Sequence, residues 1–560
     1  MKQKIFYIIA LSLGISIGTY AQDSEPTDEP IEAETVVQEL RKAQGFSVFS
    51  RLIEACGLEA ELSKIRDEAY EQAYLQGQVR DLLTHPSMQQ NGTLPQHRYY
   101  GFTLFAETDG TWETLLGKQA AAITIADIKN YLIGEGLYHQ GSKDDDYTNQ
   151  NNIVNLFTTY HILPERLAPD RLVIHYNEYG RNFKEKYCTV PVEEFYTTLG
   201  QPRLLKVYES AESKGIYLNR FPVLRNGRGQ FSAANAPDDE LRNDYHESGA
   251  FQPTKGQTLT ADENQGILVA TRDSTEQYVC DNVSAINGVI YPIGTLLANT
   301  ENVQNQLGSQ RLRFDVSSLF PEMMNNEIRS PRDYYPYGAR DIRAFPASTD
   351  YPYFDNLYIA PGSQFYYLSG FGRGWANYQA DEFNIVGAFD FTMQLPPVPV
   401  SGEYELRYGI ANQSSVRTIA QFYLGSDKEN LHASGLAVDM RVGGVEKRMR
   451  STTINSNLGW EEETTDEAYD RLVDIRLREK GYMRGPRYFL TGYYTYSPSA
   501  RERHYCLRRI VWKGHLEAGK TYYLRIKNCM DDPQLELHMD YLEWCPSNVY
   551  DNPEVPEDIW

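Results

Sequence analysis

The sequence predicts an α+β protein in two parts, a mixed part of helices and strands over residues 33–300 and an all-β sandwich or jelly roll over residues 308–548. Three observations support this division. Apolar residues recur at helical spacing from Val36 to Ile53, whereas apolar and polar residues alternate from Phe389 to Leu395, as in half-buried antiparallel strands. At 560 residues, the chain is also longer than a single core usually supports.

Residues 1–21 have the features of a secretory signal peptide. Two lysines form the positive start, an apolar core follows from Ile5 to Ile17, and Thr19 to Ala21 is a small-x-small cleavage site. The first cysteine is Cys56, so no lipoprotein cysteine stands at the mature N-terminus, and no later stretch is long and apolar enough to span a bilayer. We therefore expect an exported protein that is not membrane-spanning and is periplasmic, cell-surface-associated or extracellular.

Charge and cysteine usage narrow the classes of partner. Residues 22–32 form an acidic, proline-containing leader that is predicted to be flexible. The formal net charge of −22 at pH 7 disfavours nucleic acid and anionic membranes as partners. The six cysteines lack CxxC spacing, which argues against a zinc site. A disulfide is permitted after export, and Cys506 could pair with Cys545 or with Cys529.

The first part is predicted to mix helices and strands along the chain. Gly57 ends the first helical stretch, and an additional helix is expected between Ser63 and Arg98. Further helices are expected at Trp112 to Leu116 and at Ile123 to Leu132. Strands are predicted at Phe102–Phe105, Asn155–Leu163, Arg171–His175, Tyr187–Val190, Leu204–Tyr208, Ile216–Leu218 and Ile267–Ala270, and Asn287-Gly288 is a predicted turn.

Three stretches together resemble the signature blocks of the fasciclin domain: FTLFAETD at Phe102–Asp109, NLFTTYHILP at Asn155–Pro164 and INGVIYPIGTLL at Ile286–Leu297. The resemblance covers about residues 33–300 and departs from the family pattern at two insertions, at about 63–98 and 209–276. It implies a fasciclin-like domain with a role in extracellular adhesion or binding, in which Tyr160 and His161 would form the adhesion motif.

The Tyr160-His161 pair also has a structural interpretation, which we favour. An apolar stretch of this kind more often buries both rings, with the imidazole hydrogen-bonded to a backbone group. In animal members of the fasciclin family the corresponding motif is implicated in integrin-type adhesion. The export signal is also compatible with a bacterial protein, and a bacterial protein would meet no integrin.

Two stretches of the second part are AGKTYYLRIKN…LELHMDYLEWCP, near its end, and the upstream GEYELRYGIANQSS. The first is similar to the closing strands of galactose-binding-like jelly-roll modules, and the second is similar to one of their internal strands. Both stretches alternate apolar and polar residues. The resemblance implies a carbohydrate-binding β-sandwich, after which residues 549–560 form a C-terminal tail.

The densest aromatic region lies between Asp333 and Tyr378. Sugars present apolar C–H faces and hydroxyl rims, so their binding sites combine flat aromatic rings with Arg, Asn, Asp or Gln. On this basis the candidate ligand-binding residues are the following: Trp375, Tyr378, Arg373, Asn377 and Tyr366. The alternative is that these rings pack between the two parts of the protein or beneath a long loop.

A catalytic motif is not found. The sequence has no HExxH, no P-loop and no GxSxG outside the signal peptide, so we expect no enzyme, catalytic residue, metal site or cofactor, although structural calcium stays open. Asp144 to Asp146 is interpreted as a solvated loop. The leading hypothesis is a non-enzymatic binding or adhesion protein of the cell envelope or matrix, with a glycan as ligand. A structural scaffold that binds an envelope or matrix protein is the alternative, and an enzyme acting on polysaccharide is third.

Overall fold

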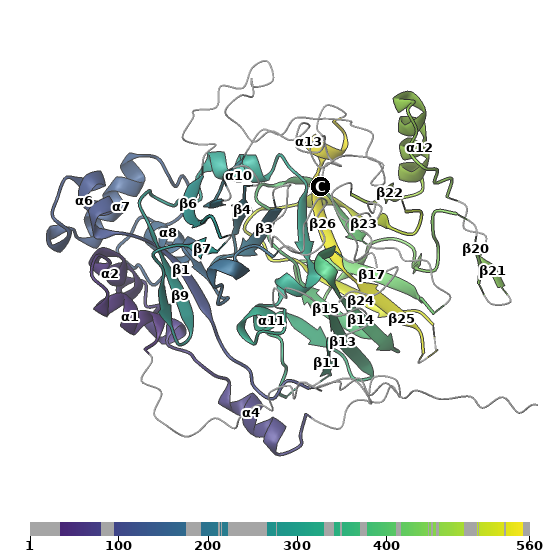
Figure 1. Cartoon of the computed structure of the whole chain (residues 1–560), viewed down its shortest axis with the longest axis horizontal. Helices are drawn as coiled ribbons and strands as arrows, with labels where there is room; N and C mark the ends of the chain where they lie inside the picture. The colour runs from purple at the N-terminus through teal and green to yellow at the C-terminus, as the bar shows by residue number, and fades with distance from the viewer. Residues whose placement is uncertain are drawn as a thin grey trace, which may run out of the picture. The chain divides into compact units, whose positions relative to one another are not determined.

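A computed structural model of the chain (Figure 1) describes residues 34–79, 94–174, 192–210, 213, 215–221, 266–275, 277–329, 341–347, 350–369, 378–409, 416–445, 447–449, 452–454, 458–486, 501, 503–530, 532 and 534–552. The predicted signal peptide and acidic leader lie outside these residues. So do residues 80–93 and 222–265 of the two predicted insertions, and residues 553–560 of the predicted tail.

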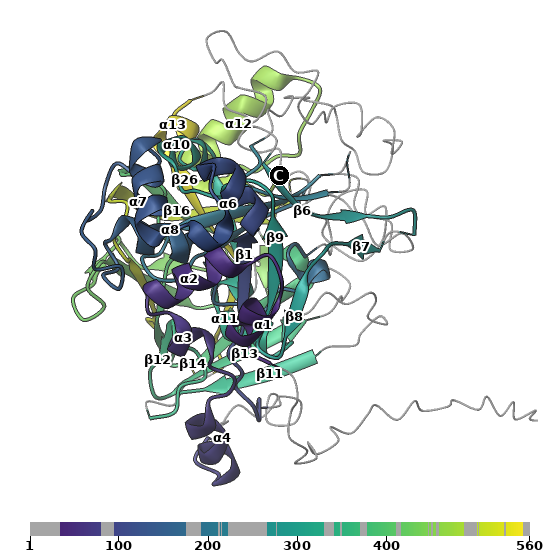
Figure 2. The ribbon, with the colours of Figure 1, turned by 90° about the vertical axis from the view of Figure 1, so that its left-hand side faces the viewer.

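The first part is built on a four-stranded sheet with the order β2-β1-β9-β8. Its central strands, β1 (Phe102–Glu107) and β9 (Gly288–Ile293), run parallel, and β2 (Ile162–Leu163) and β8 (Val283–Ala285) pair antiparallel at the edges. Helices α2, α7 and α8 lie in front of β1 in Figure 2. The helices of this part are α1 (Val36–Lys42), α2 (Ser47–Ala55), α3 (Glu59–Leu62), α4 (Glu68–Leu75), α6 (Asp109–Leu116), η1 (Ala120–Ala122), α7 (Ile125–Gly134), α8 (Ile153–Tyr160), η2 (Pro169–Arg171) and α10 (Glu301–Leu307).

Capping side chains specify where the predicted helices begin. The Thr108 hydroxyl accepts a hydrogen bond from the Thr111 N–H at the start of α6, and Thr124 forms a capping box with Asp127 at the start of α7. The additional helix expected between Ser63 and Arg98 is α4, which Asp67 caps. These three predicted helices are therefore confirmed, as is the first helical stretch, which forms α1 and α2.

The predicted strand at Asn155–Leu163 is wrong over most of its length, because Tyr160 ends helix α8 and His161 is its C-cap. Asn152 caps this helix by accepting the Val154 N–H, and every side chain from Ile153 to Tyr160 is buried. A run that is buried on all sides, here including Asn155, Thr158 and Thr159, has no apolar periodicity to distinguish a buried helix from a buried strand. The predicted strand at Arg171–His175 is also wrong for the described residues 171–174, since Pro169 begins the short helix η2 instead. The predicted strand at Tyr187–Val190 lies outside the described residues.

The predicted turn dipeptide Asn287-Gly288 lies one residue off, since the turn is formed by Ile286 and Asn287 and Gly288 begins β9. This turn holds several elements together. The Asn287 side chain accepts the Val36 N–H at 2.9 Å and donates to the carbonyls of Leu62 and Lys64, each at 2.8 Å. Gly288 is required by close packing, since an added Cβ would lie 2.2 Å from the Phe102 carbonyl oxygen. The dipeptide therefore fixes the position of α1 and α3 as well as the β8–β9 hairpin.

A five-stranded antiparallel sheet follows, in which each strand pairs with the next along the chain. The strands are β3 (Val192–Thr197), β4 (Leu204–Glu209), β5 (Gly215–Leu218), β6 (Ile267–Arg272) and β7 (Tyr278–Val279). The strands predicted at Leu204–Tyr208, Ile216–Leu218 and Ile267–Ala270 are confirmed as β4, β5 and β6. The second predicted insertion thus supplies two central strands of this sheet.

The second part consists mainly of antiparallel, sandwich-like sheets with the orders β10-β26-β16-β23-β22, β11-β13-β14-β25 and β12-β15-β24-β17-β18. β19 also pairs with β17, and β20 pairs with β21. The strands are β10 (Leu312–Asp315), β11 (Asp341–Pro346), β12 (Leu357–Ile359), β13 (Ser363–Ser369), β14 (Asp381–Gly387), β15 (Asp390–Gln394), β16 (Gly402–Gly409), β17 (Ile419–Gly425), β18 (His432–Ala433), β19 (Val438–Asp439), β20 (Lys447–Met449), β21 (Thr452–Ile454), β22 (Tyr482–Arg484), β23 (Leu507–Leu516), β24 (Tyr523–Asn528), β25 (Glu536–Met539) and β26 (Tyr541–Pro546). The helices are η3 (Val316–Leu319), α11 (Pro321–Asn325), η4 (Tyr378–Ala380), α12 (Glu467–Glu479) and α13 (Ser547–Tyr550).

The three sheets share one apolar core. The rings of Phe365 on β13 and Phe391 on β15 lie 4.7 Å apart between centroids, and those of Tyr408 on β16 and Phe422 on β17 lie 6.1 Å apart. The predicted alternation is confirmed, with Phe389, Phe391, Met393 and Leu395 all buried. Strands β24 and β25 follow each other in sequence but belong to different sheets, since β24 pairs with β15 and β17 and β25 pairs with β14.

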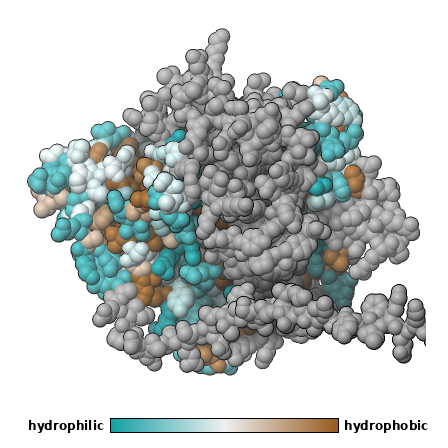
Figure 3. All heavy atoms as spheres, in the orientation of Figure 1, coloured by the Kyte–Doolittle hydropathy of each residue, from teal (hydrophilic) through white to brown (hydrophobic). Residues whose placement is uncertain are grey.

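Apolar residues of the first part pack into this same core. Tyr70 of α4 lies 5.2 Å from the Tyr353 ring, and Phe195 of β3 lies 5.8 Å from the Phe314 ring of β10. Over α6 and α7, the face in Figure 3 mixes hydrophilic and hydrophobic residues. Among the described helices, none combines the length and apolar character needed to cross a bilayer.

Candidate functional site

Of the five candidate ligand-binding residues predicted from the aromatic region, the structure describes Tyr366 and Tyr378. Arg373, Trp375 and Asn377 lie outside the described residues. Tyr366 is fully buried on β13, where its hydroxyl donates to the Gln364 side chain and where burial raises its pKa. Tyr378 is half-buried at the start of η4, and its backbone N–H donates to both carboxylate oxygens of Asp540, at 2.8 and 3.0 Å.

Tyr366 is one end of a polar row on the outer face of the sheet β11-β13-β14-β25. Side chains alternate along these strands, so that Phe365, Phe383 and Leu537 enter the core while their neighbours face outward. In register across the three adjacent strands lie Tyr366 on β13, Asn384 on β14 and His538 on β25. We call this set the β14 row and include the flanking residues Gln364, Glu382 and Glu536.

Hydrogen bonds fix the charged end of the β14 row. His538 lies between two carboxylates, with Nδ1 3.0 Å from Glu382 and Nε2 3.1 Å from Glu536. Arg417 donates to Glu536 at 2.7 Å. Burial alone would raise the pKa of Glu536, but the hydrogen bond and charge of His538, together with Arg417, hold it below its usual value.

Asn384 occupies the middle of the β14 row and has an unused acceptor. Its side chain is only 4% exposed, and among the described residues its Oδ1 has no hydrogen-bond partner. Leu94 packs against Ala344, Tyr366 and Val386 beside it, which adds an apolar surface. A buried amide oxygen without a partner is costly unless a ligand or water satisfies it.

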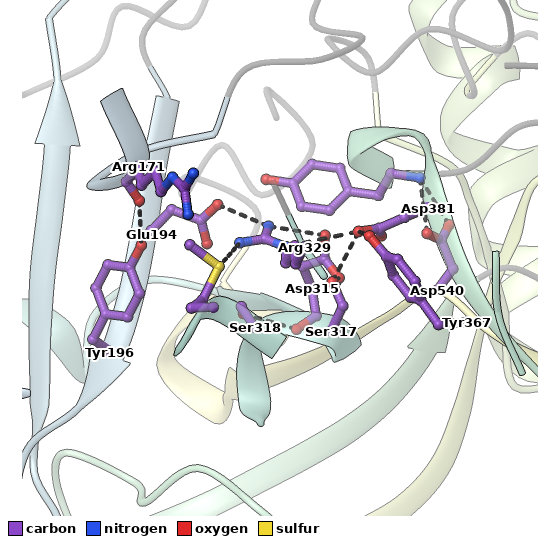
Figure 4. Close-up of polar contacts among 12 residues, drawn as sticks. Arg171, Glu194, Tyr196, Asp315, Ser317, Ser318, Arg329, Tyr367, Asp381 and Asp540 are labelled. Carbon is purple, nitrogen blue, oxygen red and sulfur yellow. Dashed lines mark hydrogen bonds and ion pairs between the residues drawn. The ribbon is translucent and has the colours of Figure 1, made fainter. Parts of the chain in front are cut away.

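A second polar cluster lies where the first part meets the sheets of the second part, and Figure 4 shows it. The Arg329 guanidinium donates from Nη2 to Asp315 at 3.0 Å and to Glu194 at 3.3 Å, and its Nε lies 3.8 Å from Asp381. All four side chains are buried. Glu194 belongs to β3, whereas Asp315 and Asp381 belong to β10 and β14, so the cluster joins the two parts.

Burial changes the acidity of this second cluster. It raises the pKa of Asp381 well above its usual value, and the nearby charge of Asp315 acts in the same direction, against the opposing effect of Arg329. Burial likewise raises the pKa of Asp540, and that of Glu165 to about 8. Strongly perturbed acids in one cluster mark either a functional site or a structural ion-pair network.

Tyr160 and His161 both face the interior. Each is fully buried, and the Tyr160 hydroxyl donates to the Leu204 carbonyl at 3.1 Å. His161 Nδ1 donates to the Phe157 carbonyl at 2.8 Å, and its Nε2 lies 2.8 Å from Glu107 Oε1. These contacts have the form that the structural interpretation of the pair expects.

The sequence predicted no metal site and left two disulfide pairings of Cys506 open. Among the described residues, no group of three or more His, Cys, Asp or Glu side chains is placed to hold a metal ion. Cys506 and Cys545 are buried and Cys529 is exposed, and among the described residues no disulfide joins any two of them, so neither of the two pairings considered for Cys506 is formed.

Sequence reasoning missed Asn384 and His538 of the β14 row and the whole Arg329 cluster. The alternation in DEFNIVG and ELHM gave the only available signal for the β14 row, because it marks Asn384 and His538 as residues of one strand face. Nothing in the sequence around Arg329 indicates its partners, which come from distant segments.

These features define a mixed α+β protein with antiparallel, sandwich-like sheets, in which the β14 row and the Arg329 cluster are buried and polar. No protein-family model matches the chain, and no curated protein matches it.

Proposed function

We propose that this is an exported, non-enzymatic binding protein of the cell envelope or matrix, and that it binds a glycan at the β14 row. The observation that carries the proposal is Asn384, a buried side chain in the middle of a row of hydrogen-bonding groups, whose Oδ1 accepts no hydrogen bond from any residue that the structure describes. The predicted signal peptide supports export. The sequence resemblance supports a fasciclin-like first part and a second part that acts as a carbohydrate-binding module.

The chemistry of the β14 row suits a sugar. Gln364, Asn384 and His538 offer amide and imidazole groups, and Glu382 and Glu536 offer carboxylate acceptors, from three adjacent strands. Sugar hydroxyls both donate and accept, so they pair with such mixed groups, while the apolar surface formed with Leu94 suits C–H faces. Rigid strands hold these groups in fixed positions, which lowers the entropic cost of binding.

A glycan-array screen of residues 22–560 tests this proposal, with Asn384→Ala as the diagnostic variant. We expect a defined glycan hit whose affinity falls at least about tenfold in Asn384→Ala, which corresponds to about 1.4 kcal/mol. Gln394→Ala is the matched control, because Gln394 is a half-buried amide on β15, in a different sheet. Silence of the wild-type protein on a broad array, or equal loss in both variants, would contradict the proposal.

A structural scaffold is the second candidate, and the buried ion pairs between the two parts favour it. Arg98, which follows α4, donates to Glu322 of α11 at 3.0 Å and to the Tyr353 carbonyl at 2.7 Å. Such contacts make a rigid unit suited to holding an envelope or matrix protein. This function predicts a stable complex or oligomer on size-exclusion chromatography with light scattering, and a monomer that captures no envelope protein would contradict it.

A further inference from the structure

The Ser317 hydroxyl lies between two carboxyl groups, although it has one proton to donate. Its Oγ is 2.7 Å from Asp315 Oδ1 and 3.0 Å from Asp381 Oδ2. The shorter contact marks the bond that Ser317 donates, so its proton goes to Asp315. Two oxygens at 3.0 Å with no proton between them repel, so the second contact requires a proton on Asp381.

The hydrogen-bond partners of the two aspartates also indicate that Asp381, and not Asp315, carries the proton. Asp315 accepts the Ser317 N–H at 2.9 Å and the Ser317 hydroxyl on Oδ1, and Arg329 at 3.0 Å on Oδ2, as an ionised carboxylate does. Asp381 Oδ2 accepts the Tyr367 hydroxyl at 2.8 Å. Among the described residues, Asp381 Oδ1 has no hydrogen-bond partner, an arrangement that costs a charged carboxylate far more than a neutral acid.

We propose that Asp381 is a neutral carboxylic acid in the folded protein, that it donates its proton to Ser317, and that this proton makes the junction between the two parts of the protein sensitive to pH. The resulting chain of hydrogen bonds runs from Tyr367 through Asp381, Ser317 and Asp315 to Arg329. Arg329 then reaches Glu194 on β3, so the chain ends in the first part of the protein.

Loss of the proton is unfavourable because the surrounding charge is mostly negative. Among the described residues, the titratable and charged groups that face Asp381 or its immediate neighbours include Asp315, Arg329, Tyr367, Glu194, Tyr196, Asp540, Glu382 and Glu165. Within this set the Arg329 guanidinium serves several carboxylates, and an ionised Asp381 adds a further buried negative charge beside Asp315. The raised pKa of Asp381 agrees with this geometry.

The sign of the pH dependence follows. An acid whose pKa is raised on folding stabilises the folded state fully below its unfolded pKa of about 4, and this stabilisation is lost as pH rises through the folded pKa. The junction is therefore firm in acid and weakens toward alkaline pH. The proposal concerns the stability of the junction and does not depend on whether a glycan binds.

The test compares wild type with Asp381→Asn by urea unfolding from about pH 5 to pH 9. The asparagine amide keeps the site neutral and can donate to Ser317, so we expect the variant to unfold at a urea midpoint at least equal to wild type at high pH. The unfolding free energy of the variant should also depend less steeply on pH than that of wild type. The difference should be up to one proton, which corresponds to a tenfold change in the unfolding constant per pH unit. Asp390→Asn is the matched control, since it removes the Arg525 partner and should lower stability without changing the alkaline slope.

Two results would overturn the proposal. One is an Asp381→Asn variant that is less stable at every pH with the wild-type slope. The other is spectroscopic: infrared spectra of the folded wild-type protein in heavy water at neutral pH should contain the carbonyl stretch of protonated, buried carboxylic acids, and Asp381→Asn should remove one component of that band. Burial also raises the pKa of Glu165, Glu322 and Asp540, so only the difference between the two spectra reports on Asp381. A wild-type band that Asp381→Asn leaves unchanged would show that Asp381 is ionised, whereas loss of one component in the variant would support the assignment.

Discussion

At the scale of single residues, the hydrogen bonds of the Glu107–His161 pair determine where its protons lie. The Phe157 carbonyl can only accept, so His161 Nδ1 carries a proton. The contact between Nε2 and Glu107 Oε1 then requires a second proton, on either partner. Glu107 Oε1 also accepts the Leu297 N–H at 3.0 Å, so the pair connects β1, the end of α8 and the segment after β9.

His161→Leu should destabilise the protein by about 3 kcal/mol or more, because it leaves a buried carboxyl group without its charged or proton-sharing partner. Glu107→Gln should cost less, since the amide can still hydrogen-bond to the imidazole. Urea unfolding of the two variants measures the difference. Equal and small losses would contradict the view that the pair is an internal link of the fold.

At the scale of elements, a ring of arginines surrounds Glu543 at the centre of β26. Arg313 on β10 and Arg407 on β16 lie directly opposite Glu543 on the two flanking strands. Arg313 donates to it at 3.0 Å, and Arg508 of β23 donates at 3.3 Å. Burial alone would raise the pKa of Glu543, but these arginines together with Arg311 outweigh it and lower the pKa to about 2.

Glu543→Gln should therefore cost about 3–5 kcal/mol, because it leaves several buried guanidinium groups without their shared carboxylate. A depressed pKa stabilises the fold above the unfolded value of about 4.5 and loses that effect as pH falls toward about 2. The loss on substitution should accordingly shrink in acid when unfolding is followed from about pH 6 downward. Glu403→Gln on the exposed start of β16 is the control and should change stability by less than about 0.5 kcal/mol.

The elements that the sequence predicted well are those with a clear period. Alternation predicted the buried face from Phe389 to Leu395, and the helical pattern predicted α6 and α7, whose caps at Thr108 and Thr124 the structure then showed. Alternation gives the face of a strand but not its partner, so it could not show that β25 pairs with β14 across about one quarter of the chain. The strand prediction at Asn155–Leu163 failed because that run is buried on every side. Asn384 and His538 could not be placed together from the sequence, because they meet only through the pairing of β14 with β25.

At the scale of the whole molecule, the two parts share a core and buried ion pairs. Tyr70 and Phe195 pack into the core of the second part. Arg98 contacts Asp67, Glu322 and Asp355. Burial raises the pKa of Glu322, although Arg98 opposes this effect. Because neither part buries these groups alone, we expect the two parts to unfold in one cooperative transition.

Replacing Arg98 tests that expectation directly. Arg98→Met leaves Glu322 buried without its guanidinium and should cost about 3–5 kcal/mol, whereas Arg41→Met removes an exposed pair with Glu59 and should cost less than about 1 kcal/mol. Unfolding is followed by the fluorescence of Trp112 in the first part and of Trp544 in β26, each assigned by its Trp→Phe variant. The two signals should coincide in wild type and move together in Arg98→Met. Two separate wild-type transitions would mean that the parts are independent domains, and the ion pairs of Arg98 and Arg329 would then serve orientation and not stability.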